Sequence, residues 1–296
     1  MKVASWNVNG AFPTHGWPEK IDHQIEFLSS FDPLPDVVLL QEVNWNQREL
    51  WRKRLREKLG YNAITDTLTW ASELRESSVQ PHQDIGHTNG NLTAVRGGEI
   101  NRRPLDLLEG EYADTDVKHL TTHYPEKILL SDCVVDGHEI EVWNVRAVPG
   151  SMKGEEKIKI LETVFDRITQ SERGLRILGG DFNTPDDELP DGQAVVDVWD
   201  KAPEIRKRWM NAELNILNGL GHVGMVDAFR YCHGYEELDV PATSFKNSRF
   251  DHIFASEALQ PTDCYYDHRA YESFDDDNEY SDHAPIVATF NPKRLD

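Results

Sequence analysis

The stretch RILGGDFNTPDD, from Arg176 to Asp187, places a carboxylate and an amide directly after a short apolar run. Asp181 and Asn183 are separated by one residue, and residues two apart on an extended segment point to the same side. The two side chains are therefore expected to face one common spot. The Gly-Gly pair that precedes them leaves room for the backbone.

The same pattern recurs along the chain, because several apolar runs end in an acid, an amide or a histidine. These side chains are Asn7, Asn9, Glu42, Asp181, Asn183, Asp251, Asp282 and His283. In layered proteins, ligands bind outside strand ends, where loops present side chains from a rigid base. A pocket built from these residues would hold several carboxylates that repel one another without a cation. Oxygen ligands of this kind suit Mg²⁺ or Mn²⁺.

The elements that must position these residues alternate irregularly between strands and helices. Strands are expected over residues 2–8, 35–43, 91–95, 175–181, 224–229, 249–256 and 284–290, with a hairpin over 127–145 that turns at Asp-Gly. Helices are expected over 20–31, 46–61, 154–170 and 202–217. This order predicts a mixed, layered α/β protein, with a single domain over residues 1–292, and argues against a purely parallel sheet.

The formal charge of the 296-residue chain is -21, which bears on both substrate and environment. Surfaces that bind nucleic acid are normally basic, so bulk charge alone argues against a nucleic-acid substrate. A metal could supply positive charge locally, so bulk charge does not decide the substrate. A strongly acidic globular chain fits a salt-rich cytoplasm, where self-repulsion is screened.

The remaining composition predicts a soluble, cytoplasmic protein. The three cysteines are odd in number and form no CxxC pair, as expected for free thiols in a reducing compartment. The N-terminal MKVASWNVNG has no apolar signal-peptide region. No run approaches the roughly 20 apolar residues of a membrane helix. We infer neither a membrane nor an obligate protein partner.

Six motifs occur in an order that is specific as a set: SWNVNG, LLQEV, GGDFNTP, GMVDAFR, SRFDHIFAS and SDHAPIV. In these motifs the chain resembles the endonuclease/exonuclease/phosphatase superfamily, which includes DNase I-like nucleases, abasic-site endonucleases and inositol-phosphate phosphatases. The resemblance covers essentially the whole chain. It implies a DNase I-like fold, a four-layer α-β-β-α sandwich of two packed mixed sheets, and a Mg²⁺ or Mn²⁺ cofactor.

The resemblance also implies roles for the residues that match the first three motifs. Asn7 would position the catalytic aspartate and the phosphate, and Asn9 would lie near the metal. Glu42 would be the main metal ligand. Asp181 would orient or deprotonate the attacking water, and Asn183 would donate a hydrogen bond to a phosphoryl oxygen.

The last two motifs supply the remaining implied roles. Asp282 would lie by the metal, and His283 would contact the scissile phosphate. Asp251 would pair with His283, which fixes its tautomer and favours its charged form.

Two positions depart from the pattern of the superfamily. Relatives carry a phosphate-contacting His or Tyr after the strand IEVWNV, where this chain has Arg146 or, counted from the following proline, Ala147. Arg146 is a candidate substrate-binding residue, because its guanidinium can donate to phosphate oxygens. The abasic-site enzymes have an aromatic residue where this chain has Ser248, which argues against specificity for abasic sites.

These observations predict a Mg²⁺- or Mn²⁺-dependent phosphodiester hydrolase that acts on DNA as an endo- or exonuclease. The alternative enzyme is a phosphatase of inositol phosphates or other small phosphorylated metabolites. The alternative of another class is a non-catalytic binding module on the same scaffold. A wide, basic rim in the loops over residues 66–89 and 97–126 would favour DNA, and a closed pocket would favour a small substrate.

The charge of -21 makes a prediction about salt. We expect the melting temperature to rise between about 0.1 M and about 1 M KCl, because the Debye length falls to about 3 Å and screens the repulsion. Thermal melts followed by circular dichroism measure this. A melting temperature that is flat or falls over that range would contradict the salt-adapted interpretation.

Overall fold

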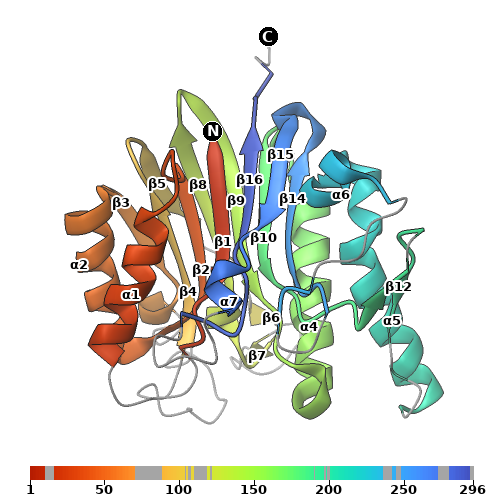
Figure 1. Cartoon of the computed structure of the whole chain (residues 1–296). Coiled ribbons are helices and arrows are strands. Elements are labelled where there is room, and N and C mark those ends of the chain that lie inside the picture. The colour runs from red at the N-terminus through yellow and green to blue at the C-terminus, as the bar shows by residue number, and fades with distance from the viewer. Residues whose placement is uncertain are drawn as a thin grey trace.

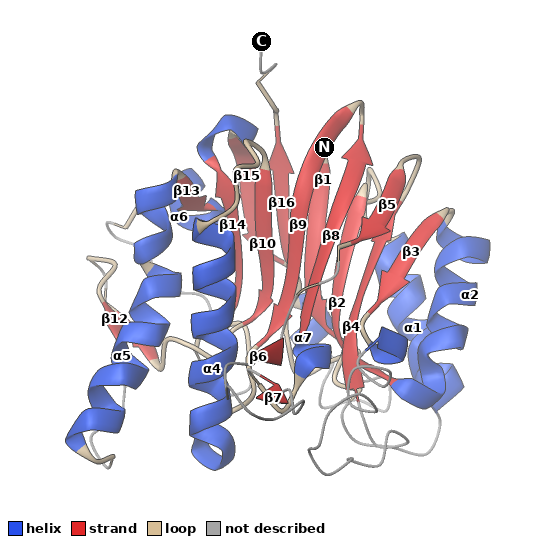
Figure 2. Cartoon of the chain, turned by 180° about the vertical axis from the view of Figure 1, so that it is seen from behind, coloured by secondary structure: helices blue, strands red, loops and turns tan. Residues whose placement is uncertain are grey.

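Two six-stranded sheets pack face to face, with helices on their outer sides (Figure 1). The computed structural model describes residues 1–10, 17–70, 89–103, 105, 108–109, 119–120, 122–189, 191–196, 198, 201–235, 242–244, 248–272 and 280–293. Seen from behind in Figure 2, the two groups of helices again lie on opposite sides of the paired sheets. The architecture is the predicted four-layer sandwich.

The first sheet combines one parallel strand pair with antiparallel neighbours. Its order is β15 (Pro261–Tyr266), β16 (Ile286–Phe290), β1 (Lys2–Asn7), β2 (Val37–Asn44), β4 (Asn89–Val95) and β3 (Ala63–Asp66). Strands β1 and β2 are parallel, and the other neighbours are antiparallel. All eight residues of β2 are buried, as its continuous apolar run predicted.

The second sheet has the same kind of arrangement, so β1 and β2 in one sheet correspond to β9 and β10 in the other. Its order is β13 (Met225–Asp227), β14 (Asp251–Ser256), β10 (Arg176–Asp181), β9 (His138–Arg146), β8 (Ile128–Val135) and β5 (Glu99–Arg102). Strands β9 and β10 are parallel. Two short pairs lie outside the sheets: β6 (Leu108–Glu109) with β7 (His119–Leu120), and β11 (Asp187–Glu188) with β12 (Ala194–Val195).

Helices cover both outer faces and divide the core into three apolar layers. The helices are α1 (Trp17–Ser29), α2 (Arg48–Leu59), α4 (Gly150–Thr169), α5 (Pro203–Leu217), α6 (Ala228–His233) and α7 (Arg269–Glu272). Trp6 and Trp51 belong to the layer beneath α1 and α2, and Trp143 and Trp209 to the layer beneath α4 and α5. Aliphatic side chains such as Ile177 fill the layer between the sheets. Each such fully buried side chain contributes about 1.5–3 kcal/mol.

The predicted elements largely agree with the observed ones, with two kinds of difference. The strand predicted over 224–229 ends at Asp227, whose carboxylate accepts from the backbone N–H groups of Phe229 and Arg230 at 3.0 and 3.3 Å and so caps α6. Strands β3, β5 and β15 were not predicted. They are edge strands without a continuous buried run: β3 has four residues, β5 alternates between exposed and half-buried positions, and β15 contains two exposed residues, so they lack the signal of a buried strand.

Two further findings concern segments named in the sequence predictions. No helix in the described part of the chain is long and apolar enough to cross a bilayer. The cysteines Cys133, Cys232 and Cys264 form no disulfide, as predicted. Most of the two loops over 66–89 and 97–126, which would distinguish a DNA rim from a closed pocket, lies outside the described residues.

The two glycines of β10 allow close packing at the end that carries the polar residues, Gly179 against the other sheet and Gly180 against the neighbouring strand β9. A Cβ on Gly179 would lie 2.7 Å from Cδ1 of Leu39 in the other sheet. Gly180 has a φ of +151°, and a Cβ there would lie 1.7 Å from the carbonyl oxygen of Val145. Both positions therefore exclude a side chain: Gly179 because it packs on the other sheet, and Gly180 because of its backbone conformation and its contact with the neighbouring strand of its own sheet.

We expect Gly180→Ala to lower the free energy of unfolding by more than about 2 kcal/mol, because it adds a backbone clash to a strained φ. Gly60→Ala is the matched control: Gly60 has a φ of +75° with nothing within 4 Å of a built Cβ, so only conformational strain of about 1 kcal/mol applies. Urea unfolding of both variants measures the difference. Equal losses would show that the close contact at Gly180 is unimportant.

Candidate active site

Strand register places three of the predicted site residues in one row across the second sheet. Asp181 at the end of β10 lies opposite Asp251 on β14 and opposite Arg146 on β9. Directly opposite residues of neighbouring strands point to the same face of a sheet. The row therefore presents two carboxylates and a guanidinium together. The backbone of Ala147 continues this edge, while its side chain is fully buried in the apolar core, so Arg146 is the residue that reaches the site.

The first sheet contributes Glu42 through an irregularity in β2. The pairing of β2 with β4 shifts register between Leu40 and Val43, and Glu42 within this bulge has a φ of +61°. A left-handed conformation is uncommon for Glu, and bulges redirect side chains next to functional sites. Gly10 fixes the bulge from the other side, since a Cβ there would lie 2.1 Å from the Glu42 carbonyl oxygen.

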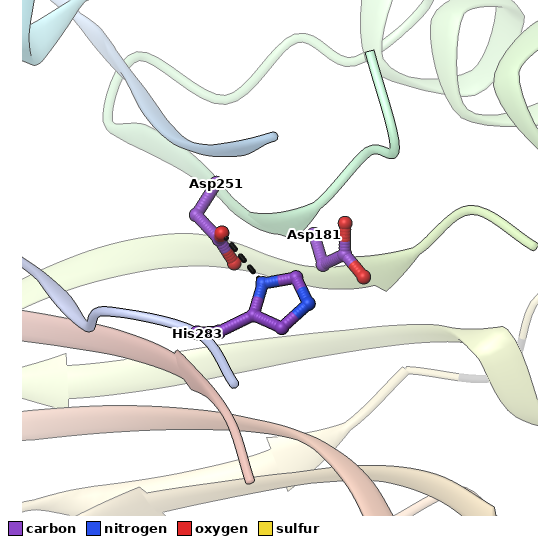
Figure 3. A group of neighbouring side chains, drawn as sticks. All are labelled: Asp181, Asp251 and His283. Carbon is purple, nitrogen blue, oxygen red and sulfur yellow. Dashed lines mark hydrogen bonds and ion pairs between the residues drawn. The ribbon is translucent and has the colours of Figure 1, made fainter. Parts of the chain in front are cut away.

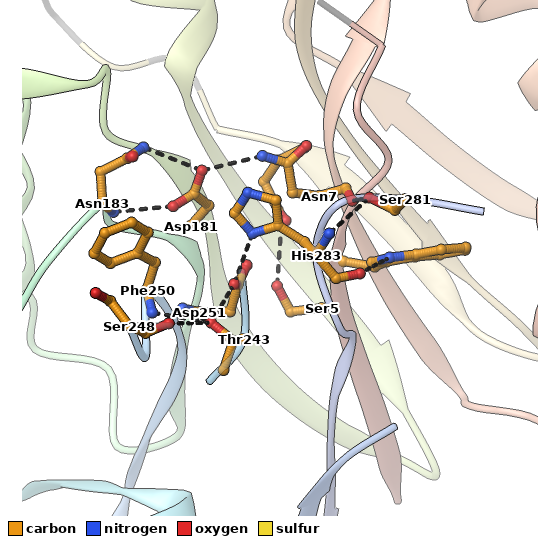
Figure 4. Close-up of polar contacts among 12 residues, drawn as sticks. Ser5, Asn7, Asp181, Asn183, Thr243, Ser248, Phe250, Asp251, Ser281 and His283 are labelled. Carbon is orange, nitrogen blue, oxygen red and sulfur yellow. Dashed lines mark hydrogen bonds and ion pairs between the residues drawn. The ribbon is translucent and has the colours of Figure 1, made fainter. Parts of the chain in front are cut away.

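Asn7, at the end of β1, links the two sheets through its amide. Its Nδ2 donates to Oε1 of Glu42 at 3.1 Å. It also donates to Oδ2 of Asp181 at 3.0 Å (Figure 4). The Asn7 side chain is 1 % exposed, so these bonds are shielded from water. The amide thereby fixes the relative positions of two carboxylates that come from different sheets.

Asn183 also lies against Asp181, although the reason differs from the predicted one. Nδ2 of Asn183 donates to Oδ2 of Asp181 at 3.1 Å, and the Asn183 backbone N–H donates to Oδ1 at 2.9 Å. Strand β10 ends at Asp181, and Asn183 has a φ of +50°. The two side chains therefore meet through a tight turn, whereas the sequence suggested the alternation of an extended strand.

His283 lies between Asp251 and Asp181, as Figure 3 shows. Its Nδ1 is 2.8 Å from Oδ2 of Asp251, which also accepts from the hydroxyl of Thr243 at 2.7 Å. Asp251 is fully buried, and its Oδ1 has no hydrogen-bond partner among the described residues. The pair therefore has the geometry predicted for an aspartate that orients a histidine.

The backbone around His283 is held by residues that the sequence did not single out. The indole N–H of Trp6 donates to the His283 carbonyl oxygen at 2.9 Å. The hydroxyl of Ser281 donates to the Asn7 carbonyl oxygen at 2.6 Å and accepts from the His283 N–H at 3.2 Å. Ser281 thus joins the end of β1 to the histidine loop, which gives the serine of the SDH motif a structural purpose.

The charges in this buried cluster change the proton affinities of its members. Burial alone would lower the pKa of His283, but the carboxylates of Asp251 and Asp181 raise it to about 10. Burial raises the pKa of Asp181 to about 6; Asp251 acts in the same direction, while His283 and Arg146 oppose it. His283 is therefore a cation near neutral pH, and Asp181 lies close to the range in which a carboxylate exchanges protons.

Arg146 contacts the carboxylates of both sheets. Its Nη2 forms an ion pair with Oε1 of Glu42, and its Nε lies 3.9 Å from Oδ2 of Asp181. Burial favours the neutral form of Glu42, but Arg146, Lys127 and the amide of Asn7 together hold its pKa below the usual value. Glu42 is thus ionised in the described structure.

Lys127 is a site residue that sequence reasoning missed. It is 4 % exposed, directly precedes β8, and donates from Nζ to the carbonyl oxygen of Asn89 at 2.6 Å and to the side-chain oxygen of the same residue. The signal available in the sequence was its position at the start of the predicted hairpin, where β8 pairs with β9, the strand that carries Arg146. Lys157 on α4 is a second missed cation: its Nζ donates to the Asn183 carbonyl oxygen at 2.7 Å and pairs with Glu213.

The oxygen donors predicted for a metal fit a divalent cation at Glu42. Burial raises the pKa of Asp282, and the charge of Glu42 adds to this effect while His283 opposes it. A divalent cation would remove the repulsion between these two carboxylates. The backbone of Asn9 lies near Glu42, because the next residue, Gly10, packs on the Glu42 carbonyl group. The carbonyl oxygen of Asn9 accepts a hydrogen bond from Nζ of Lys20 at 3.3 Å.

A second group could hold a metal by distance alone. One ligand atom each of Asp181, Asp251 and His283 lies within 4.8 Å of the others. The imidazole uses Nδ1 for Asp251, and its pKa of about 10 keeps it protonated. A protonated imidazole is a donor and a cation, so in the described structure the positive charge of His283 itself balances these two carboxylates.

The position where abasic-site enzymes carry an aromatic residue is a structural one in this chain. Ser248 is 7 % exposed, and its hydroxyl donates to the Asp186 carbonyl oxygen at 2.8 Å. The arginine that follows, Arg249, is buried and pairs with Glu188 and Asp227, each at 2.7 Å. Despite burial, Arg249 holds the pKa of Asp227 well below its usual range. This part of the motif therefore supports the strand that carries Asp251.

A four-layer sandwich with a polar site at the ends of its two central strand pairs is the architecture of DNase I-like proteins. The sequence model described as Endonuclease/Exonuclease/phosphatase family matches residues 4–283, and the chain belongs to that family. Members of the family typically hydrolyse phosphoric esters. No curated protein sequence is significantly similar to the chain.

Solved structures share the fold at low sequence identity. A humanized D. rerio TDP2 with 14 mutations is 18 % identical, with 98 % of each chain covered and a TM-score of 0.62. D. rerio TDP2 complexed with a single strand DNA product is 19 % identical over 98 % of each chain, with a TM-score of 0.59. An endonuclease/exonuclease/phosphatase from Bacteroides vulgatus is 16 % identical, covering 99 % of this chain and 98 % of that one, with a TM-score of 0.60.

The raised pKa of His283 predicts how stability depends on pH. The folded-state pKa of about 10 exceeds the ordinary value of 6.5, so the histidine stabilises the fold fully below pH 6.5, and this contribution is lost as the pH rises toward 10. Urea unfolding of chelator-treated protein measures this. The free energy of unfolding should fall between pH 6.5 and pH 10, and it should fall less in His283→Gln.

An NMR titration of His283 tests the cause of the shift. In Asp251→Asn the imidazole pKa should fall from about 10 toward 6.5, because the largest attractive charge is removed. An unchanged His283 pKa in Asp251→Asn would refute the pairing as its cause.

Proposed function

We propose that the protein is a Mg²⁺- or Mn²⁺-dependent phosphodiester hydrolase with DNA as its substrate, acting as an endo- or exonuclease. The observation that carries this proposal is the arrangement around Asp181. Its carboxylate is fixed by the amides of Asn7 and Asn183, and it lies in the same buried cluster as a histidine whose pKa is raised to about 10. A base, two neutral donors and a cation at one point match the needs of phosphoryl transfer.

The proposed roles follow from the protonation states. Asp181, whose pKa is raised to about 6 by burial, orients and deprotonates the attacking water. His283 is protonated and donates to a non-bridging phosphoryl oxygen, with Asp251 holding its ring in place. Asn7 and Asn183 align Asp181 with the phosphate. For the amide of Asn183 to donate to a second phosphoryl oxygen, it releases the carbonyl oxygen of Ala147, which it contacts at 2.8 Å in the described structure.

The cofactor is proposed to be held by Glu42 and Asp282, with Asn9 nearby. The bound cation supplies Lewis-acid stabilisation of charge on the phosphate oxygens. Arg146 adds a fixed positive charge and two parallel N–H donors on the same side of Asp181. It thus takes the place of the His or Tyr that the superfamily has at this position.

Positive side chains around the site support an anionic substrate in spite of the net charge of -21. Arg146, Lys127, Lys157 and Lys20 all lie at or beside the residues described above. The solved D. rerio TDP2 with its single strand DNA product has the same fold. Together these points support DNA as the substrate class.

A substrate panel tests the proposal. Purified protein with Mg²⁺ or Mn²⁺ is incubated with plasmid DNA, single-stranded and duplex oligonucleotides, an abasic-site duplex, RNA and a small phosphomonoester, at low and high salt. We expect cleavage of DNA that excess EDTA abolishes and added metal restores. Asp181→Asn serves as the control for contaminating nucleases. Turnover in excess EDTA, or turnover confined to the phosphomonoester, would contradict the proposal.

Glu42→Gln separates metal binding from folding. We expect it to raise the metal concentration for half-maximal activity by on the order of tenfold or more, because a ligand charge is lost. Glu139→Gln is the matched control, since Glu139 has a side chain that is 75 % exposed on the same sheet as Asp181. Activity titrations with Mn²⁺ on both variants decide the point. A common shift in both variants would reflect net charge and would rule out Glu42 as a ligand.

A further inference from the structure

Arg146 occupies the place of a cation between two carboxylates. Its Nη2 pairs with Oε1 of Glu42, and its Nε lies 3.9 Å from Oδ2 of Asp181. The side chain is only 12 % exposed, and Nε has no hydrogen-bond partner among the described residues. A buried N–H without a partner is costly, so this donor is available for an acceptor that the described structure does not provide.

The two oxygens that Arg146 approaches are the same two that Asn7 bridges. Nδ2 of Asn7 lies 3.1 Å from Oε1 of Glu42 and 3.0 Å from Oδ2 of Asp181. The amide is neutral, so it fixes the distance between the carboxylates without neutralising them. Arg146 supplies the positive charge, and the parallel register of β9 and β10 places it opposite Asp181.

We propose that Arg146 is the internal counter-ion of the metal-free site, and that a divalent cation displaces it from Glu42. The displaced guanidinium turns its two N–H donors to a phosphate oxygen. This inference rests on the proposed function, because it takes Glu42 as a metal ligand. It adds that the cation and the substrate anion bind cooperatively through one arginine.

The physical basis is competition between two positive charges for one carboxylate oxygen. Two cations within about 4 Å of each other in a shielded site repel strongly, so the guanidinium and the metal cannot both contact Oε1. The metal must therefore do the work of breaking the ion pair, which weakens its apparent affinity. An anion that engages Arg146 removes this penalty, and by linkage the metal strengthens anion binding by the same factor.

Isothermal titration of Mn²⁺ into chelator-treated protein tests the inference without any turnover. The proteins are the wild type, Arg146→Ala, Arg146→Lys and a matched control, Arg208→Ala. Arg208 is an exposed residue on α5 that pairs with Glu155 and Glu162. Its removal changes the net charge by the same amount as removal of Arg146, but solvent screening makes the effect on the potential at the site far weaker. Thermal melts in EDTA and in Mn²⁺ accompany each titration.

We expect Arg146→Ala to bind Mn²⁺ on the order of tenfold more tightly than the wild type, and Arg208→Ala to differ by about twofold or less. The melting temperature of Arg146→Ala should also be lower than that of the wild type in EDTA and should recover in Mn²⁺. The reason is that Glu42 and Asp181 lack a counter-ion in this variant only when no metal is bound. Arg146→Lys keeps the charge, so its Mn²⁺ affinity and its melting temperature in EDTA should stay close to those of the wild type. If Arg146→Ala folds poorly in EDTA, a Mn²⁺ affinity of Arg146→Lys that differs from the wild type as much as that of an uncharged variant would count against the inference.

Sulfate, used as a tetrahedral dianion at constant ionic strength, tests the cooperative part. It should tighten Mn²⁺ binding several-fold in the wild type and have little effect in Arg146→Ala. Mn²⁺ affinity in Arg146→Ala that equals or falls below that of the wild type would overturn the inference and leave the proposed function intact. Absence of Mn²⁺ binding in every protein would overturn both.

Discussion

The site depends on one electrostatic constraint: acidic side chains from both sheets are buried at the same edge, and each needs a matching donor. Glu42 and Asp181 are joined by the amide of Asn7 and by Arg146, while Asp251 is matched by His283. Removing Arg146 or His283 would take away the charge that faces a buried carboxylate, which typically costs several kcal/mol, whereas removing the neutral amide of Asn7 would cost a hydrogen bond. The close approach of the sheets, for which Gly179 of β10 leaves room beside Leu39, brings the donors within reach.

The same constraint explains why the motifs contain more residues than the chemistry uses. Arg249 and Asp227 lie away from the site, yet their buried pairing anchors β14 and β13 behind Asp251. Ser281 joins β1 to the histidine loop, and Trp6 fixes the backbone of His283 from the first sheet. These contacts hold the side chains in place, so the motif sequences specify both the reacting groups and their supports.

The sequence predicted the four-layer fold and the residues that gather at the site, because strand ends and ordered motifs are local signals. It could not predict the direction of the Glu42 side chain, because that direction depends on a bulge in the pairing of β2 with β4. It left Arg146 and Ala147 as alternatives, since one residue of register decides which side chain faces the site. Lys127 was missed because its partners, Asn89 and Glu42, belong to the other sheet and are distant in sequence. Contacts between the two sheets are not encoded in any local pattern.

The central proposal is a division of labour, in which Glu42 and Asp282 would hold the metal while Asp181, Asp251 and His283 would serve the water and the phosphate. Anomalous diffraction from crystals grown with Mn²⁺ tests it most directly. We expect one strong anomalous peak within about 2.2 Å of carboxylate oxygens of Glu42 and Asp282, with the imidazole of His283 still paired to Asp251. A peak coordinated by Asp181, Asp251 and His283, with none at Glu42, would contradict the account.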